Sequence, residues 1–313
     1  MKCVPVEVGG VDSGDEACAN CGTTASDTVK LKNCTACRLV KYCGVDCQRA
    51  HRKQHKKECK QRVAELKDEQ LYSQGLERME GDFCPICSLP IPVPMAEHAG
   101  FSACCMKRIC NGCLFAAQKR GITDCPFCRT PCPDDDADGL VMMQKRVAKK
   151  DPEAIFFLGE KCFHGKFGVQ KDMRRVVKLW TEAAELGSID ALFELGNVHY
   201  FGEGVKKDEK MAIHFWSKAA MQGHVTSRYQ LGIIEGTHGN YDSEVKHLLI
   251  SSKMGDKNSL ERIKTLFTRG DATEEDFSKA LKGYRDAMEE TKSKDRDEAK
   301  RLLDNAVQRK GVA

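Results

Sequence analysis

The sequence predicts a multidomain protein in which two small, cysteine-rich α+β modules precede an all-α helical-repeat solenoid. Of its 18 cysteines, all but Cys162 lie at or before Cys132, and fifteen of these form two blocks, mostly as closely spaced pairs. Beyond residue 150, two stretches of similar sequence follow one another. The acidic run "PDDDADG" separates these regions, so we place an acidic joint and helix at residues 133–150.

The hydropathy of the chain indicates its compartment. We find no apolar stretch of signal-peptide length at the N-terminus, where residues 1–13 are expected to be flexible. No run of about eighteen apolar residues occurs, so no membrane span is expected. We therefore expect a reducing compartment, the cytoplasm or the nucleus, where clustered cysteines are metal ligands more often than disulfides.

The first cysteine block holds eight soft or borderline metal ligands within 42 residues, enough for two tetrahedral zinc sites. Pairs separated by two residues form tight knuckles that bring two sulfurs to one ion. Ligands four residues apart project from the same face of a helix. The ligands are Cys18, Cys21, Cys34, Cys37, Cys43, Cys47, His55 and Cys59.

Together with Tyr42, Gln48, His51 and Lys56, these ligands resemble a MYND-type zinc finger over residues 14–62. The resemblance implies two interleaved sites, one held by Cys18, Cys21, Cys43 and Cys47, the other by Cys34, Cys37, His55 and Cys59. His51 stands at a frequent non-ligand position of the family; the alternative is that it replaces His55.

MYND fingers usually bind short proline-containing peptides in a shallow groove, which implies protein or peptide partners. Gln48 matches a groove residue of the family, whereas Arg52 stands where the family has a tryptophan. The six basic residues between Arg49 and Lys60 offset the charge of the thiolates. We interpret them as a solvated helix face, with nucleic-acid contact as the alternative.

Residues 63–81 are predicted to form a charged helical linker that ends at Gly81. The second cysteine block then supplies eight more ligands, as three pairs separated by two residues and one adjacent pair. These ligands are Cys84, Cys87, Cys104, Cys105, Cys110, Cys113, Cys125 and Cys128. About four zinc ions per chain are therefore expected from the sixteen ligands.

The order of the second block resembles a RING-type zinc finger over residues 82–132. It implies that Cys84, Cys87, Cys110 and Cys113 hold one zinc ion, and that Cys125 and Cys128 hold the other. Lys107 stands where a RING finger commonly has a histidine, and a protonated lysine cannot ligate. Either Cys104 and Cys105 complete the second site, which we favour, or His98 does. Cys132 is a spare thiol.

Many RING fingers are ubiquitin ligases that recruit a ubiquitin-conjugating enzyme and form no covalent bond themselves. The family positions for this contact are occupied here by Ile86, Pro126 and Arg129. Arg129 could bond both partners through its planar guanidinium. Ile86 and Pro126 also suit simple packing of the knuckles, so a non-catalytic zinc-finger scaffold or adaptor is the alternative function.

Residues 151–268 contain the repeats. Ala154 and Ala191 are 37 residues apart, and Trp180 and Trp216 are 36 apart, which indicates stacked helical hairpins. The units resemble Sel-one-like repeats, relatives of tetratricopeptide repeats that bind proteins. A shortened third unit lacks the tryptophan, and "NSLERIKTLF" is half of another. Residues 269–313 are expected to form a charged helical cap or tail.

Net charge argues against nucleic acid as the main partner. The formal charge of +4 counts every cysteine as neutral, whereas fifteen thiolates and four zinc ions would lower it to about −3. This balance is not typical of a nucleic-acid-binding protein. The sequence therefore predicts a zinc-binding protein-interaction protein, either a RING-type ubiquitin ligase or a non-catalytic adaptor.

Overall fold

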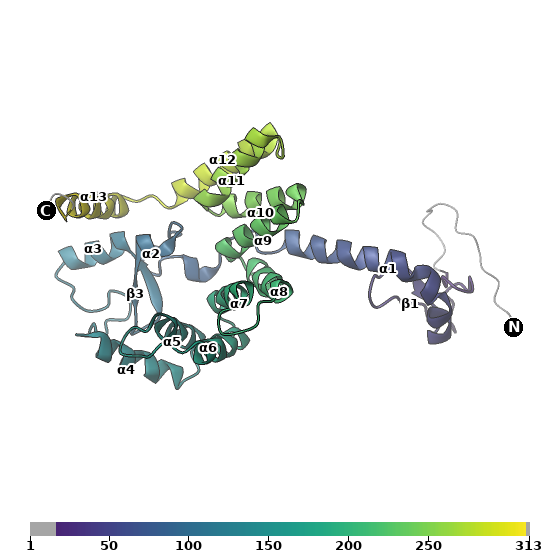
Figure 1. Ribbon diagram of the computed structural model, residues 1–313, viewed down its shortest axis with the longest axis horizontal. Coiled ribbons are helices and arrows are strands. Elements are labelled where there is room, and N and C mark those ends of the chain that lie inside the picture. The colour runs from purple at the N-terminus through teal and green to yellow at the C-terminus, as the bar shows by residue number, and fades with distance from the viewer. Residues whose placement is uncertain (1–16, 311–313) are drawn as a thin grey trace. The chain divides into compact units, whose positions relative to one another are not determined.

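The computed structural model describes residues 17–310, with side chains described as far as residue 305. The N-terminus expected to be flexible, residues 1–13, lies outside the described residues. The chain divides between Ser73 and Gln74 into two compact units, and each is described by itself. The predicted fold class is confirmed: small cysteine-rich α+β modules precede an all-α helical-repeat region (Figure 1).

The first unit is a β-hairpin followed by a long helix. Strands β1 (Lys32–Asn33) and β2 (Lys41–Tyr42) are antiparallel, with Lys32 opposite Tyr42. Helix α1 (Val45–Ser73) has 29 residues, of which His55 is buried. The buried residues of the small core are cysteines and Tyr42, and only a few partly buried aliphatic side chains such as Leu31 and Val40 pack against them, so the stability of the unit depends on what the cysteines bind.

The predicted helical linker over residues 63–81 is wrong at its C-terminal end. Helix α1 stops at Ser73, and only a short 3-10 turn, η1 (Glu80–Asp82), follows before the second module. Gly75 has a φ of +61°, in the left-handed region that ends helices. A Cβ at Gly75 would overlap the carbonyl oxygen of Ala220, so the chain is held against the repeats there.

The second cysteine-rich module belongs to the second unit. Its elements are α2 (Met95–His98), β3 (Ala99–Ser102), β4 (Lys107–Cys110) and α3 (Asn111–Lys119). Strands β3 and β4 form an antiparallel hairpin with Ala99 opposite Cys110. Ile91 and Ile109 are fully buried among the cysteines, so the hairpin and the knuckles share one core.

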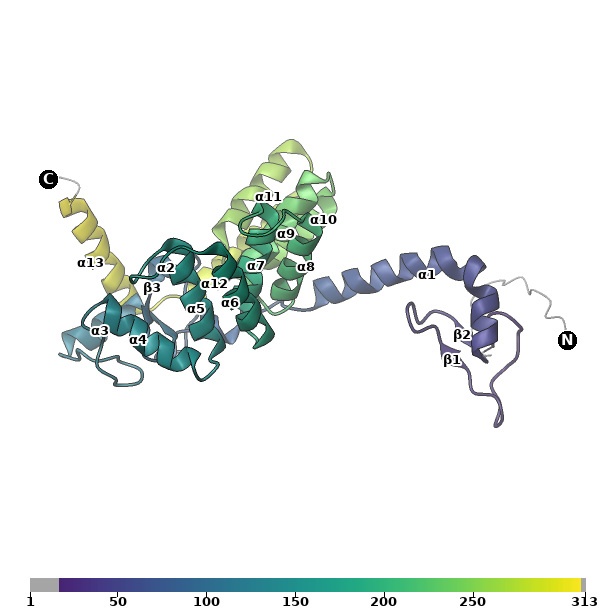
Figure 2. The ribbon, with the colours of Figure 1, turned by 60° about the horizontal axis from the view of Figure 1, so that its bottom comes forward.

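The repeat region is a stack of antiparallel helical hairpins (Figure 2). The expected acidic joint carries α4 (Asp136–Val147), which packs against the first hairpin. Asp151 caps the first helix of the stack, Pro152 begins it, and the left-handed Gly165 ends it. The hairpins are α5 (Pro152–His164) with α6 (Met173–Glu185), α7 (Ile189–Phe201) with α8 (Glu209–Ala220), and α9 (Val225–Thr237) with α10 (Tyr241–Lys253).

A tryptophan packed on a glycine holds each of the first two hairpins together. A Cβ at Gly159 would lie 2.4 Å from Nε1 of Trp180, and one at Gly196 would lie 2.3 Å from Nε1 of Trp216. The third hairpin has no tryptophan, and Leu248 takes the space against its glycine, Gly232. The third unit is therefore a complete hairpin with a smaller side chain between its helices.

The predicted end of the repeats at residue 268 falls at the end of a helix, and the next helix packs on the stack. Helix α11 (Lys257–Arg269) pairs with α12 (Glu274–Glu290), and both pack on α10, so the half unit is one side of a fourth hairpin. Its core includes Ile263, Leu266 and Ala280. Helix α13 (Lys294–Lys310) does not cap the stack; it packs along α3 of the second module (Figure 1).

None of the helices among the described residues is long and apolar enough to cross a membrane.

Candidate metal centres and interaction surfaces

The structure brings all sixteen predicted ligands together in four groups of four. Within each group the ligand atoms lie within 4.8 Å of one another. The groups are Cys18, Cys21, Cys43 and Cys47; Cys34, Cys37, His55 and Cys59; Cys84, Cys87, Cys110 and Cys113; and Cys104, Cys105, Cys125 and Cys128.

The spacing of the sulfurs fits a tetrahedral zinc ion. Bonds of about 2.3 Å place two sulfurs roughly 3.8 Å apart across the ion, whereas a disulfide needs about 2.05 Å. The distance between Sγ atoms is 3.6 Å for Cys21 and Cys43, 3.8 Å for Cys87 and Cys110, and 3.9 Å for Cys105 and Cys125. The described cysteines are all free thiols. Each group could therefore hold one zinc ion.

The first unit interleaves its two groups around the hairpin. Nε2 of His55 lies 3.1 Å from Sγ of Cys37, inside the second group. His51 lies outside both groups: its Nδ1 is 3.2 Å from the hydroxyl of Tyr42, and its ring stacks on that of His55. Burial would raise the pKa of Cys34, but backbone N–H groups of Cys37 and Ala36 lower it to about 6. The zinc-binding thiolate is thereby favoured.

The second module holds its first group between two knuckles. The thiol of Cys110, together with its own backbone N–H, lowers the pKa of Cys84 to about 4 despite burial. The N–H of Cys110 lies 3.5 Å from Sγ of Cys84, and Cys110 in turn accepts from the N–H of Cys113 as the N-cap of α3. These donors favour negative charge on the sulfurs where a metal ion would bind.

The second group of this module contains the adjacent pair Cys104 and Cys105, and not His98. His98 ends α2 and lines a separate cavity beside α13. Lys107 begins β4 and is exposed. Cys132 is exposed and Cys162 is buried in the repeat core, so both lie outside the four groups.

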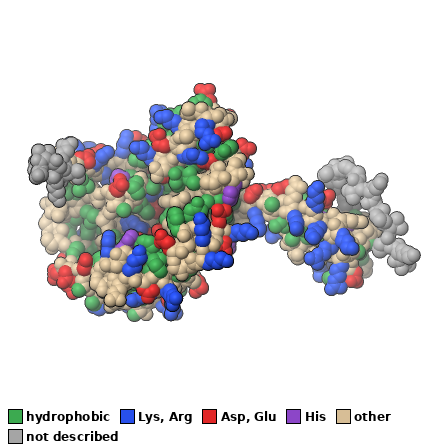
Figure 3. Space-filling view, in the orientation of Figure 1, with side chains coloured by type: hydrophobic (Ala, Val, Ile, Leu, Met, Phe, Trp, Pro, Cys, Tyr) green, Lys and Arg blue, Asp and Glu red, His purple; other side chains and the backbone are tan. Residues whose placement is uncertain are grey.

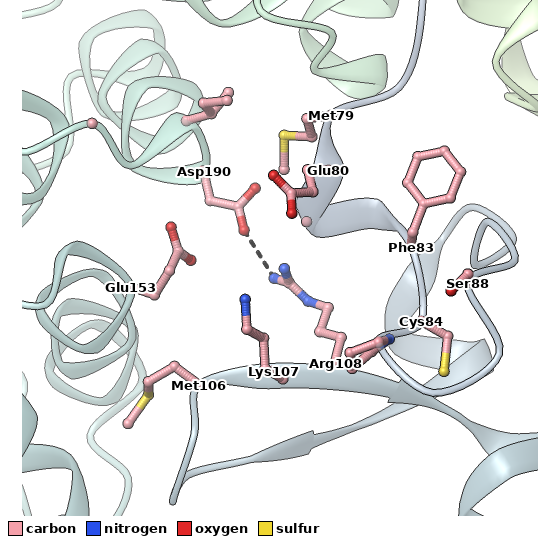
Figure 4. Close-up of a pocket in the computed structure, with 14 residues that line it drawn as sticks. Met79, Glu80, Phe83, Cys84, Ser88, Met106, Lys107, Arg108, Glu153 and Asp190 are labelled. Carbon is pink, nitrogen blue, oxygen red and sulfur yellow. Dashed lines mark hydrogen bonds and ion pairs between the residues drawn. The ribbon is translucent and has the colours of Figure 1, made fainter. Parts of the chain in front are cut away.

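A cavity of about 550 Å³ lies between the second module and the repeats. In Figure 4, Arg108 extends from β4 toward Asp190 at the start of α7, with Lys107 and Glu153 beside them. Nη2 of Arg108 is 2.9 Å from Oδ2 of Asp190, and Nε2 of His224 is 3.6 Å from Oδ1. Burial alone would raise the pKa of Asp190, but the hydrogen bond with His224 and the charge of Arg108 lower it to about 2.

Sequence reasoning missed this ion pair because its partners are 82 residues apart and neither belongs to a motif. Burial and the charge of Asp190 raise the pKa of Glu153 to about 7. Asp190 stays ionised opposite Arg108, and this ion pair joins the second module to the repeats across the cavity. We call the ion pair and the residues beside it the charged seam.

A second cavity, of about 500 Å³, lies on the surface of the first unit between the hairpin and α1. Ala36, Tyr42 and Val45 supply apolar surface, and Val45 is 61% exposed. Gln48 lines the cavity, as the sequence suggests for a peptide groove, and so does Arg52. Lys and Arg side chains gather on this unit in Figure 3. We call this cavity the first-finger groove.

The three side chains named for a conjugating enzyme lie at the tips of knuckles in the second module. Ile86 is 42% exposed between Cys84 and Cys87. Pro126 is half-buried between Cys125 and Cys128, and Arg129 is exposed in a left-handed conformation with a φ of +61°. The exposed side chains are accessible to a partner.

Comparison with known families identifies two of the modules. Residues 18–59 match the MYND finger, and residues 152–188 and 189–224 each match the Sel1 repeat. The chain therefore carries a MYND zinc finger followed by Sel1 repeats, as its sequence predicted. No curated protein matches the chain.

Several solved structures are similar to part of the chain. The Sel1 repeat protein from Oxalobacter formigenes is 19% identical, with 56% of this chain and 72% of that chain covered and a TM-score of 0.45. The protective antigen c5321 of uropathogenic Escherichia coli, with an SLR fold, is 23% identical over 57% of this chain and 45% of its own, with a TM-score of 0.35. Cysteine rich protein B of Helicobacter pylori is 28% identical over 30% of this chain and 69% of its own, with a TM-score of 0.28. These scores are low, so the repeat assignment rests on the family match and the hairpins.

Proposed function

We propose that the protein is a zinc-dependent adaptor that binds other proteins through its MYND finger and its Sel1 repeats. Both modules are protein-interaction modules. The observation that carries the proposal is the first-finger groove, which offers exposed apolar surface at Ala36 and Val45 beside Gln48. A short peptide segment is a ligand that fits an open surface with apolar and polar side chains of this kind.

The rim of the groove indicates which peptides bind. Arg49, Arg52, Lys56 and Lys60 line it, and within residues 17–310 only Arg49 has an ion pair, 3.8 Å from Asp46. The adjacent zinc group, with three thiolates and one divalent ion, would carry −1, which leaves the groove positive. We therefore expect proline-containing peptides flanked by Asp or Glu to bind better than neutral ones.

Fluorescence anisotropy on the full zinc-loaded chain tests this function. Acidic, neutral and basic versions of one proline-containing peptide are compared. Lys56→Ala should weaken the acidic peptide about two- to fivefold. Lys57→Ala is the matched control, because Lys57 does not line the groove. Failure of every peptide would overturn the peptide-binding role, and equal affinities would overturn the charge preference. Tighter, strongly salt-dependent binding to RNA or DNA would favour the nucleic-acid alternative.

The second candidate function is RING-type ubiquitin ligation by the second module. It is supported by two groups of four cysteines in cross-brace order and by the exposure of Ile86 and Arg129 at the knuckles. Pro126 completes the proposed surface for a ubiquitin-conjugating enzyme. Catalysis would consist of orientation and hydrogen bonding, with no covalent residue.

A ubiquitin-transfer assay with the purified protein and a panel of conjugating enzymes tests the ligase. Arg129→Ala should abolish transfer while the zinc content stays the same. If no conjugating enzyme supports transfer, the second module is a scaffold and the adaptor function stands alone.

We also propose that the protein acts in the cytoplasm or the nucleus, because its cysteines must remain reduced to bind zinc. Fluorescence microscopy of a tagged chain checks this, and secretion into the medium would contradict it.

A further inference from the structure

The C-terminal helix α13 packs on the second module although the two are far apart in the sequence. Nζ of Lys119, at the end of α3, lies 2.7 Å from Oε1 of Glu298 on α13. A Cβ at Gly112 would lie 2.7 Å from the backbone nitrogen of Arg296, so the two helices approach closely at their N-terminal ends. Figures 1 and 2 both place α13 beside α3.

Arg296 connects α13 directly to one of the four candidate zinc groups. Its Nη1 donates to the carbonyl oxygen of Pro90 at 2.5 Å and to that of Thr291 at 2.9 Å. Its Nη2 donates to the carbonyl oxygen of Leu89 at 3.1 Å and lies 3.4 Å from Sγ of Cys87. The planar guanidinium thus spans the first knuckle and contacts one of its ligand sulfurs.

The position of Arg296 is unfavourable for α13 alone. It lies in the first turn of the helix, where the backbone dipole disfavours a positive charge. Three carbonyl oxygens and a sulfur compensate for this cost. The sulfur is a strong acceptor only as a thiolate, the form that zinc binding stabilises.

We propose that Arg296 is an outer residue of the zinc centre formed by Cys84, Cys87, Cys110 and Cys113, and that docking of α13 and zinc binding there reinforce each other. With zinc bound, four thiolates and one divalent ion carry −2, and this charge lies next to a half-buried guanidinium that already contacts Sγ of Cys87. Because such coupling is reciprocal, a docked α13 tightens zinc binding by the same factor as zinc tightens docking.

The inference rests on the proposed zinc occupancy, and it gives the C-terminal helix a role that the repeats do not supply. Loss of this one metal ion would release α13 from α3. Docking would thus report the state of the second module to the C-terminal end of the repeats, where α12 and α13 adjoin in sequence.

Site-resolved alkylation tests the proposal on the full zinc-loaded chain. The protein is challenged with a chelator and a thiol reagent, and mass spectrometry follows each cysteine. In Arg296→Ala, cysteines 84, 87, 110 and 113 should be modified about 10- to 100-fold faster than in the wild type. The other three groups should be unchanged. Arg296→Lys should be intermediate, because an ammonium cannot span all of these acceptors.

Two controls separate metal coupling from packing. Arg301→Ala removes an exposed arginine of the same helix whose one hydrogen bond, among the described residues, is to the carbonyl oxygen of Asp297, and it should change nothing. Glu298→Ala removes the ion pair with Lys119 but keeps the guanidinium at Cys87, so its effect should be smaller than that of Arg296→Ala.

Equal rates in Arg296→Ala and the wild type, or equal acceleration at all four groups, would overturn the coupling. If wild-type cysteines 84, 87, 110 and 113 react equally fast before and after chelation, the zinc proposal for this group fails instead.

Discussion

Gly196 tests how the repeat hairpins are packed. It lies on α7 against the ring of Trp216, which is 1% exposed. A Cβ at this position would lie 2.3 Å from Nε1, 2.4 Å from Cδ1 and 2.9 Å from Cε2 of that ring. Ordinary contacts begin at about 3.5 Å. The rigid ring cannot bend away, so Gly196→Ala must push α7 and α8 apart.

The change in the free energy of unfolding caused by Gly196→Ala is the sum of two opposing effects. Overpacking of a core costs about 1–3 kcal/mol, whereas replacing glycine by alanine within a helix contributes about 1 kcal/mol of stability. Because the Cβ overlaps three ring atoms, we expect the overpacking cost to be about 3 kcal/mol. The net loss in the free energy of unfolding is then about 2 kcal/mol. For the second unit, which contains the repeats, this loss of stability lowers Tm by about 4–8 °C. Tm is measured by circular dichroism at 222 nm with zinc present.

The third hairpin supplies the control. A Cβ at Gly232 would meet Cδ2 and Cγ of Leu248 at 3.2 Å and the carbonyl oxygen of Glu244 at 3.3 Å, all much looser than the contacts at Gly196. Gly232→Ala should therefore change Tm by less than half as much as Gly196→Ala. If Gly196→Ala is as stable as the wild type, the tryptophan does not set the distance between the helices.

Three further predictions concern the metal and the buried charges. Chelation should unfold both cysteine-rich modules and leave the repeats helical, because small metal modules owe their folding energy to the ion; near-ultraviolet and far-ultraviolet circular dichroism separate the two. Burial raises the pKa of Glu194 from 4.5 to about 7, so its protonated form stabilises the fold below pH 4.5 and this contribution is lost as pH rises through about 7. Glu194→Gln should therefore raise Tm at pH 8 and leave it nearly unchanged at pH 5. Asp190→Ala should cost about 3 kcal/mol in urea unfolding at pH 7, because it leaves Arg108 without its partner in the seam; a loss below 1 kcal/mol would contradict that role.

Ligand types and spacings made the four metal groups predictable. A pair of cysteines two residues apart brings its sulfurs together through local geometry alone, whatever the rest of the chain does. Cys104 and Cys105 were harder, since an adjacent pair and His98 were both compatible with the spacing. In the structure the sulfurs of Cys104 and Cys105 lie within 4.8 Å of those of Cys125 and Cys128, whereas His98 ends α2 outside this group.

The errors arise where contacts between distant residues override the local pattern. Residues after Ser73 are as charged as those before it, so nothing nearby reveals that Gly75 packs on Ala220. The charged sequence of residues 269–313 left a cap and a tail both open, and the packing of α12 on α10 and α11 through Ala280 is not visible in it. The contacts of Arg296 with Cys87 and of Arg108 with Asp190 span 209 and 82 residues and have no motif.

The zinc content of the purified protein tests the central claim most directly. Native mass spectrometry, with elemental analysis of the same sample, should find about four zinc ions per chain and every ligand cysteine reduced. A folded, active protein that contains no zinc, or whose sulfurs are oxidised in pairs, would contradict the account of both modules.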